Sequence, residues 1–276
     1  FAGAVHTYAA DALMGSGKVL QLPSTHLLGQ NFSKPFDVKF MDKDGKEKYV
    51  FITCYGPAIS RNYGALIALH GDNKGLILPF AVAPVHIVIV PIFYKDSETK
   101  VMKKCKDIQK KLKNYEVRLD DRDHNPGYKF NEWEMKGVPI RIDIGPKDVE
   151  SKSVTLYRRD FGSKKTIPEK ELLKTVATIE QEFTENLKKR TTKEFEQSIV
   201  FVSEKAKIKT VLDDNKIAKT NFCTIDKEGE ACAAYIEKEC LGLVRGKRVD
   251  EEEQPQGNCL VCGKKATVTV YIARSY

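Results

Sequence analysis

Four cysteines near the end of the chain have the residue type and the spacing to hold a metal ion. Two residues separate Cys259 from Cys262, and the glycine that follows makes a turn that aims two thiolates at one point, as in tetrahedral zinc sites. Upstream, Cys223 and Cys232 could complete a set of four thiolates, although Cys240 competes with Cys232 for the fourth place.

The same cysteines allow a simpler interpretation, in which they are reduced, buried thiols and the Cys-x-x-Cys pair is a redox pair. Zinc is favoured, because the pair stands just before a C-terminal strand and more cysteines lie upstream. Such a zinc ion would be structural, since four thiolates leave no open position. The gap between Cys223 and Cys232 is wider than is usual, and seven cysteines, an odd number, do not suggest a disulfide framework.

A second candidate is the stretch SRNYGALIALHGDNKGLILP, residues 60–79. It places Arg61 before an apolar helical segment and then gathers Asp72 and Lys74 in a tight turn between Gly71 and Gly75. The turn could cradle a phosphate, connect two packed elements, or belong to a site led by Arg61. A phosphate-transferring enzyme is a poor interpretation, because the chain has no Gly-x-x-x-x-Gly-Lys-Ser/Thr pattern.

A third candidate lies in residues 122–148, which contain a turn, a short amphipathic helix with the only tryptophan, and a strand. Glu134, Arg141 and Lys147 lie around the helix–strand junction. A carboxylate there can accept from base amino groups, while Arg and Lys contact acceptor edges and phosphates. From the charge pattern alone, we favour a solvated charged face with Trp133 in the core.

Composition places few limits on function. A chain of 276 residues with 41% hydrophobic and 30% charged residues is typical of a folded, soluble protein with two or three domains. The excess of 46 Lys and Arg over 38 Asp and Glu is weak evidence for a polyanionic partner. Residues 76–94 are apolar enough to resemble a membrane span, but their prolines and the VHIVIV run favour a buried strand.

Periodicity predicts the elements that must position these residues. Residues 37–54 read as a hairpin around an Asp44–Gly45 turn, and YGALIALH (63–70) reads as a buried helix. After a boundary at Pro79 to Pro84, strands alternate with helices, which predicts an α/β layer. The predicted strands are 85–93, 115–121, 138–145 and 153–160, and the predicted helices follow Ser97 and a capping box from Thr166 to Glu169.

The apolar positions of these elements predict their buried faces. In residues 138–145 the apolar side chains share one face, and Arg141 and Asp143 share the other. The last part of the chain holds five of the seven cysteines and ends on the alternating strand TVTVYI. The apolar helix positions are Val101, Cys105, Ile108 and Leu112 in the first helix and Leu172, Val176, Ile179, Phe183 and Leu187 in the second.

Five sequence blocks match one known family in order and spacing from residue 1 to residue 276. They are FAGAVHTYAADAL, QLPSTHLLGQNFSKPFDVKF, SRNYGALIALHGDNKGLILPFAVAP, PGYKFNEWEMKGVPIRIDIGPKD and the closing RSY. Jointly they resemble prolyl-tRNA synthetase of the archaeal/eukaryotic type, a class II aminoacyl-tRNA synthetase.

The resemblance implies a mixed α/β (α+β) chain with three parts. These are the C-terminal portion of an antiparallel class II catalytic sheet (1–82), an α/β anticodon-binding domain (83–198) and a small zinc-type α+β domain (199–276). It implies a proline–tRNA ligase that uses ATP with Mg²⁺ to make prolyl-adenylate from L-proline and charges tRNA(Pro). It also implies structural Zn²⁺, a cytoplasmic location, no membrane attachment and a homodimer when complete. The alternative is a non-catalytic tRNA-binding zinc module.

The resemblance also assigns roles by position. Arg61 matches the motif 3 arginine, whose guanidinium fork would pair with ATP phosphate oxygens, which leaves the turn after it as a plain turn. The C-terminal carboxylate of Tyr276 is expected near the active site. The remaining positions are Gln21 and Ser24 for ATP, His26 and Ser60 for proline, Glu134, Arg141 and Lys147 for the anticodon, and Cys223, Cys232, Cys259 and Cys262 for zinc.

Several features depart from the family. The segment PSTH replaces the usual Gly-Thr-Ser-His, and CYGPAISR is one residue longer than its usual counterpart, which affects the alignment of Tyr55 and Ser60. The chain begins at Phe1, and class II motifs 1 and 2 are expected upstream of it. We therefore predict that these 276 residues alone do not form prolyl-adenylate.

Overall fold

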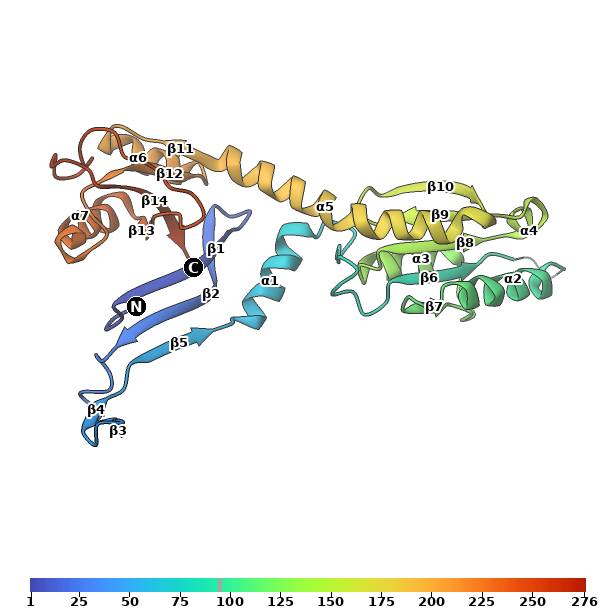
Figure 1. The fold of residues 1–276 in the computed structure, drawn as a ribbon. Helices are drawn as coiled ribbons and strands as arrows, with labels where there is room; N and C mark the ends of the chain where they lie inside the picture. Colours follow the sequence, from blue (N-terminus) through green and yellow to red (C-terminus); the bar gives the residue numbers. More distant parts are fainter. Residues whose placement is uncertain (94–95) are drawn as a thin grey trace. The chain divides into compact units, whose positions relative to one another are not determined.

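The computed structural model describes residues 1–93 and 96–276. By internal contacts the chain divides into two compact units. The first unit comprises Phe1–Ala65 with Glu194–Tyr276, and the second unit is Leu66–Lys193 (Figure 1). The division at residues 82 and 198 into three domains stays a prediction, since two of its parts share one compact unit here.

A seven-stranded sheet organises the first unit. Strands from both ends of the chain join it, because the start of one N-terminal strand pairs in parallel with the C-terminal strand at Lys18 and Val19. In sheet order the strands are β1 (His6–Leu13), β2 (Lys18–Gly29), β14 (Val268–Ser275), β12 (Ile217–Phe222) and β11 (Ile199–Phe201), with β5 (Ile52–Gly56) paired to β2 and β13 (Leu243–Gly246) paired to β14.

The antiparallel pairing expected near the N-terminus is present in β1, β2 and β5, because β2 pairs antiparallel with both of the others, while the catalytic role of this sheet stays a prediction. The C-terminal part packs α6 (Lys205–Asp213) and α7 (Glu230–Tyr235) around a separate core. That core contains Val202, Ile208, Leu212, Phe222, Ile236, Val270 and Ile272.

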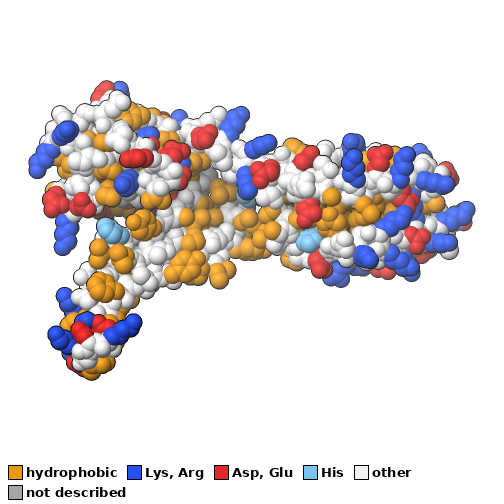
Figure 2. All heavy atoms as spheres, in the orientation of Figure 1, with side chains coloured by type: hydrophobic (Ala, Val, Ile, Leu, Met, Phe, Trp, Pro, Cys, Tyr) orange, Lys and Arg blue, Asp and Glu red, His pale blue; other side chains and the backbone are white. Residues whose placement is uncertain are grey.

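Two predictions for the first 70 residues need correction. The hairpin is shorter than 37–54, with β3 (Lys39–Met41) and β4 (Glu47–Tyr49) joined by the predicted turn, because β5 leaves it to pair with β2. The helix α1 (Ile59–His70) exists, but Ala65 is its one fully buried residue. The α1 residues before Ala65 are exposed and most of those after it are half-buried, and Figure 2 shows hydrophobic side chains exposed over β5 and this helix.

A five-stranded mixed sheet forms the centre of the second unit. Three adjacent strands, including one edge strand, pair in parallel, and the two strands on the other side make antiparallel pairs. In order, the strands are β10 (Ser163–Pro168), β9 (Ser153–Arg158), β8 (Ile140–Ile144), β6 (Ile87–Pro91) and β7 (Val117–Leu119).

Helices cover both faces of this sheet, which explains its continuous apolar strands. Ile87 and Ile89 lie in a core with α2 (Glu98–Lys111) and the first half of α5 (Leu172–Ser198). Val88 and Val90 pack instead with Trp133 of α3 (Pro126–Met135). All nine apolar helix positions predicted for α2 and α5 are buried.

The capping box at Thr166 was wrong. Thr166 lies in strand β10, where it pairs with Thr155, and the chain turns helical only at Glu169. Glu169 does not cap the helix but forms ion pairs with Lys104 and Lys111. Strand pairing overrode the local capping pattern, because β10 extends the sheet by pairing with β9.

None of the helices in residues 1–93 and 96–276 combines the length and the apolar character needed to cross a bilayer.

Candidate functional site

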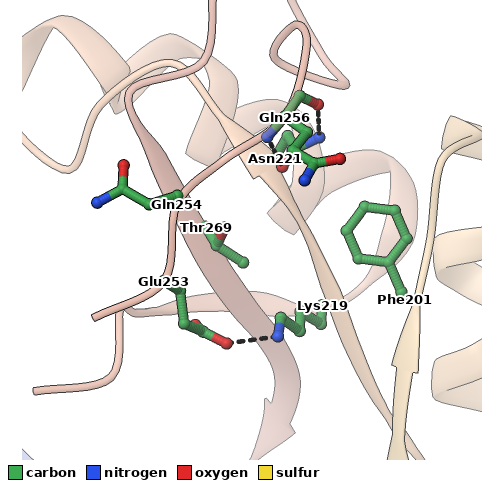
Figure 3. A pocket seen from close by; sticks show the side chains of 7 residues that line it. All are labelled: Phe201, Lys219, Asn221, Glu253, Gln254, Gln256 and Thr269. Carbon is green, nitrogen blue, oxygen red and sulfur yellow. Dashed lines mark hydrogen bonds and ion pairs between the residues drawn. The ribbon is translucent and has the colours of Figure 1, made fainter. Parts of the chain in front are cut away.

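A cavity of about 320 Å³ in the first unit is lined by none of the predicted site residues (Figure 3). Its polar groups largely bind one another: Lys219 pairs with Glu253, and the Asn221 side chain bonds to the Gln256 backbone. One Glu253 oxygen, Oε2, is buried without a hydrogen-bond partner among the described residues. We assign no ligand to this cavity, because its cation and its main acceptor neutralise each other.

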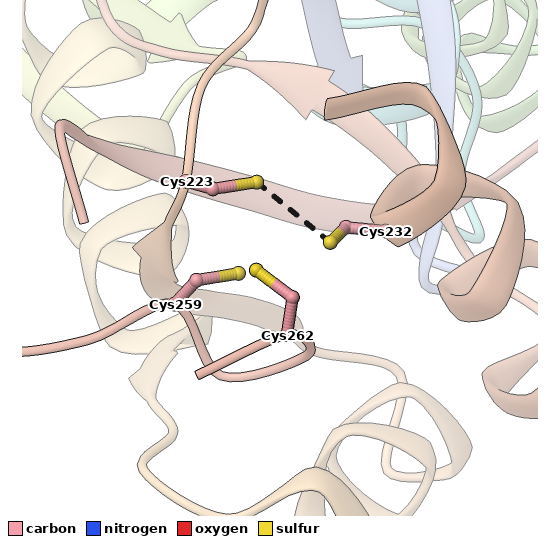
Figure 4. Close-up of side chains that lie close together, drawn as sticks. All are labelled: Cys223, Cys232, Cys259 and Cys262. Carbon is pink, nitrogen blue, oxygen red and sulfur yellow. Dashed lines mark hydrogen bonds between the residues drawn. The ribbon is translucent and has the colours of Figure 1, made fainter. Parts of the chain in front are cut away.

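The four predicted cysteines come together beside this cavity's strands (Figure 4). Their Sγ atoms all lie within 4.8 Å of one another, and those of Cys223 and Cys232 are 3.7 Å apart. Cys223 follows β12, Cys232 lies in α7, and the other two cysteines lie in the loop before β14. The structure therefore selects Cys232 over Cys240, which is buried in the same core but lies outside the group of four.

This group fits a tetrahedral metal ion. Zinc–thiolate bonds of roughly 2.3 Å place tetrahedral sulfurs about 3.8 Å apart, close to the spacing seen here. Burial raises the pKa of the Cys223 and Cys232 thiols, whereas the backbone N–H of Lys264 lowers the pKa of Cys262 to about 7. A divalent cation would supply the positive charge that buried thiolates need. All seven cysteines are free thiols in the structure.

Strand β2 and helix α1 bring together two of the predicted nucleotide-contacting residues. The Nη1 atom of Arg61 donates to the backbone oxygen of Gln21 at 3.2 Å, while the rest of the guanidinium is exposed. The fork therefore has a fixed anchor and free donors, which is the condition for binding phosphate oxygens.

A β-bulge sets the direction of the β2 side chains. Asp11 of β1 pairs with Gln21, and Ala9 pairs with Ser24, so two residues of β2 oppose one residue of β1. The extra residue turns Gln21 and Ser24, three positions apart, toward the same face. Pro23 lies within the bulge, where the ladder hydrogen bond that proline cannot donate is not required.

The predicted proline-pocket histidine is buried and held from both ring nitrogens. Ser24 Oγ lies 3.1 Å from His26 Nε2, and Thr7 Oγ1 lies 2.9 Å from Nδ1. Sequence reasoning did not find Thr7, because its partner on β2 is 19 residues away and only strand pairing joins them. Ser60 is exposed next to Arg61, just after Ala58, whose φ of 48° marks a strained entry into α1.

The C-terminal residue lies at the start of the same strand. Tyr276 donates its backbone N–H to the oxygen of Val19 at 3.4 Å, and its hydroxyl lies 2.7 Å from Ser16 Oγ. Gln21 follows two residues further along β2. The C-terminal strand thus brings the end of the chain to the strand that carries the predicted ATP contacts.

In the second unit, the structure joins Glu134 and Arg141. Arg141 Nη1 donates to Glu134 Oε1 at 2.9 Å, and Nε donates to Asp143 at 2.8 Å. The guanidinium lies between two aromatic rings, 3.8 Å from the Phe130 centroid and 4.4 Å from that of Tyr157. Arg141 is only 3% exposed, so the solvated charged face was wrong, although Trp133 is buried as expected.

Lys147 is placed differently from the other two predicted anticodon residues. It is exposed in the first turn of α4 (Pro146–Ser151), beyond the carboxyl end of β8, whereas Arg141 lies at the start of that strand. At roughly 3.3 Å per residue, the strand separates the two by about 10 Å or more. Glu134 and Arg141 therefore form one group, and Lys147 is a separate cation.

Two segments of the chain match known protein families. Residues 86–179 match the family model "Anticodon binding domain", and residues 205–276 match "Prolyl-tRNA synthetase, C-terminal". The whole chain is 45% identical to a proline–tRNA ligase from Thermofilum pendens and 41% identical to one from Methanothrix thermoacetophila. The chain belongs to the prolyl-tRNA synthetase family.

The fold agrees with the family over the full chain. A prolyl-tRNA synthetase from Cryptosporidium parvum, solved with halofuginone and AMPPNP, matches 100% of this chain with a TM-score of 0.91 and 34% identity. The chain covers 58% of that structure's chain, and 58% and 56% of the two archaeal relatives. It therefore spans somewhat more than half the length of these family members.

Proposed function

We propose that the chain is the motif 3, anticodon-binding and C-terminal part of a proline–tRNA ligase. The full-length enzyme would activate L-proline with ATP and Mg²⁺ and transfer prolyl to tRNA(Pro) in the cytoplasm, as a homodimer. The observation that carries the proposal is the match of the entire chain to proline–tRNA ligases at 45% and 41% identity.

The residues around β2 support proline activation by positioning and charge neutralisation. Arg61 would hold ATP phosphate oxygens with the donors that Gln21 leaves free. His26, fixed by Ser24 and Thr7, would line the proline pocket in one orientation. The proline carboxylate would attack the α-phosphorus and displace pyrophosphate, so no covalent enzyme nucleophile is needed.

The second unit supports tRNA recognition. The Glu134 carboxylate would accept from amino groups of anticodon bases, and exposed Lys147 would contact a phosphate or an acceptor edge. Arg141 would hold the Glu134 carboxylate from its buried side, since the donors of Arg141 are already bound to two carboxylates. The four cysteines would hold a structural Zn²⁺, because they leave no open coordination position.

The proposed function can be tested with the full-length enzyme. It should charge tRNA(Pro) with proline, and its thermal midpoint should rise with proline and an ATP analogue through mass action. A midpoint that responds to tRNA but to neither small ligand would favour the alternative of a non-catalytic tRNA-binding zinc module. Cysteine in place of proline tests the selectivity of the pocket.

The isolated 276-residue chain should not support proline-dependent ATP–pyrophosphate exchange. Its relatives are longer, and exposed apolar side chains on β5 and α1 suggest a surface that the full-length enzyme covers. These side chains are Tyr55, Ile59 and Tyr63, with Phe51 just before β5. Exchange by this chain at the rate of the full-length enzyme would contradict the expectation.

Replacing Arg141 by Ala in the full-length enzyme should weaken anticodon discrimination by about 10- to 100-fold, the scale of one base-specific contact. The loss would follow because the Glu134 and Asp143 carboxylates lose their shared partner. Pyrophosphate exchange should be spared. Arg118, an exposed arginine of β7, gives the matched control Arg118→Ala, and equal losses in both variants would refute the role of Arg141.

A further inference from the structure

The Gly71–Gly75 turn is closed on itself and held by a buried arginine. The Asp72 and Gly75 backbones exchange two hydrogen bonds of 3.0 Å. Arg159, which follows β9 and is 1% exposed, donates from Nη1 to Asp72 Oδ2 at 2.8 Å and from Nη2 to Asp72 Oδ1 and the Gly75 oxygen. The Arg159 guanidinium lowers the pKa of Asp72 to about 2, so the pair is ionised at neutral pH.

The same arginine reaches the last turn of α3. Its Nε donates to the backbone oxygen of Glu134 at 3.2 Å, so one guanidinium ties the turn to the residue that carries the predicted anticodon carboxylate. The Leu76 N–H donates to the Met135 oxygen at 3.1 Å, which adds a second tie at the next residue.

Two glycines permit this close approach. Gly75 has φ of 132°, and a Cβ there would lie 2.3 Å from Met135 Cα. Gly137 has φ of 74°, and its Cβ would lie 2.6 Å from Leu76 Cβ. No side chain fits at either position without displacing backbone, so the turn and the end of α3 are pressed together.

The Glu134 side chain is approached by a cation from each side. Arg141 donates to Oε1 at 2.9 Å, and Lys74, from the turn, lies 3.8 Å from Oε2. The Glu134 side chain is 16% exposed. Its partner on Oε2, Lys74, is 60% exposed, whereas its partner on Oε1, Arg141, is 3% exposed, so Oε2 is the oxygen on the outward side.

We propose that the Gly71–Gly75 turn positions Glu134 for reading the anticodon. Asp72, acting through Arg159, fixes the backbone of the last α3 turn, and Lys74 sets the charge and orientation of the outward Glu134 oxygen. Asp72, Lys74 and Arg159 are positioning residues that need not touch the tRNA. The inference rests on the proposed function and names the elements that set its specificity.

The test uses the full-length enzyme with Asp72→Asn and Lys74→Ala. The readout is the ratio of kcat/KM for tRNA(Pro) to that for tRNA(Pro) with one anticodon base replaced. Asp72→Asn should lower the ratio about tenfold, within the range of a single base contact, and Lys74→Ala about threefold, somewhat less than one such contact. The Asp72 side chain is 44% exposed, so the Asn variant should fold.

A matched control separates positioning from general stability. Asp160 is the aspartate partner of the neighbouring arginine, Arg158, at 2.8 Å, and its side chain is 1% exposed. Asp160→Asn should lower the thermal midpoint at least as much as Asp72→Asn but leave the ratio unchanged, because Arg158 pairs with Asp160 and Glu182 rather than with α3.

A double mutant supplies the decisive comparison. In a Glu134→Gln background, Asp72→Asn should lower the ratio no further, because residues that act through one group are not additive. Full additivity, or an unchanged ratio in Asp72→Asn alone, would overturn the inference while leaving the proposed function intact. A wild-type enzyme that charges no tRNA(Pro), or shows no anticodon preference, would overturn both.

Discussion

Replacing Arg61 by Ala in the full-length enzyme should lower kcat/KM for proline activation by about 100-fold or more, the scale seen when one preorganised charge-stabilising group is removed. The guanidinium is anchored on the Gln21 backbone and Arg61 is otherwise exposed, so its remaining donors are available for ATP phosphate oxygens. Binding of tRNA should change little, because the predicted anticodon residues lie in the second unit. ATP–pyrophosphate exchange and tRNA binding measure the two effects separately.

Two further variants sharpen this expectation. Arg61→Lys should recover only part of the activity, because an ammonium keeps the charge but not the planar fork. Lys48→Ala, at an exposed cation of the β3–β4 hairpin, should leave both assays unchanged. If Arg61→Ala weakened tRNA binding and spared exchange, the phosphate role of Arg61 would be wrong.

Replacing Cys259 by Ser should remove about one equivalent of zinc and destabilise the C-terminal part of the first unit. Metal binding by four thiolates is coupled to folding, and the apparent zinc-binding energy of such sites is on the order of 10 kcal/mol. Losing even several kcal/mol of this should lower the thermal midpoint by about 10 °C or more. Metal analysis and thermal unfolding of the same sample provide the check.

The control is Cys240→Ala, since Cys240 is equally buried but lies outside the group of four. It should lower stability through a small cavity and keep its zinc. A chelator should reproduce the Cys259→Ser midpoint in the wild type and have little effect on the serine variant. Wild-type protein without stoichiometric zinc would contradict the zinc proposal.

The regular elements of the second unit could be predicted from the sequence because their signals are local and strong. The helical spacing of Val101, Cys105 and Ile108 specifies one buried helix face. The β-branched run of β6 specifies a strand that is buried on both faces. Thr166 shows the limit of such signals. Its cap pattern was overridden when strand pairing with β9 placed it in the sheet.

The candidate site divides in the same way. The Cys259–Cys262 turn follows from four consecutive residues, but only the packing of α7 placed Cys232, and not Cys240, beside it. Arg61 could be predicted from its segment, yet its anchor at Gln21 lies 40 residues away. The resemblance indicated Glu134 and Arg141, whereas their mutual ion pair and burial emerged from the fold.

The sequence by itself determined the family, the zinc-type cysteine spacing and the periodic helices and strands, since each depends on residues close together in the chain. The tertiary structure decided the features that depend on contacts between distant parts of the chain. It joined β14 to the start of β2, paired Thr7 with His26, and used Arg159 to hold Asp72 across 87 positions. Such contacts carry no local signal, because they form only when distant segments share one sheet or one core.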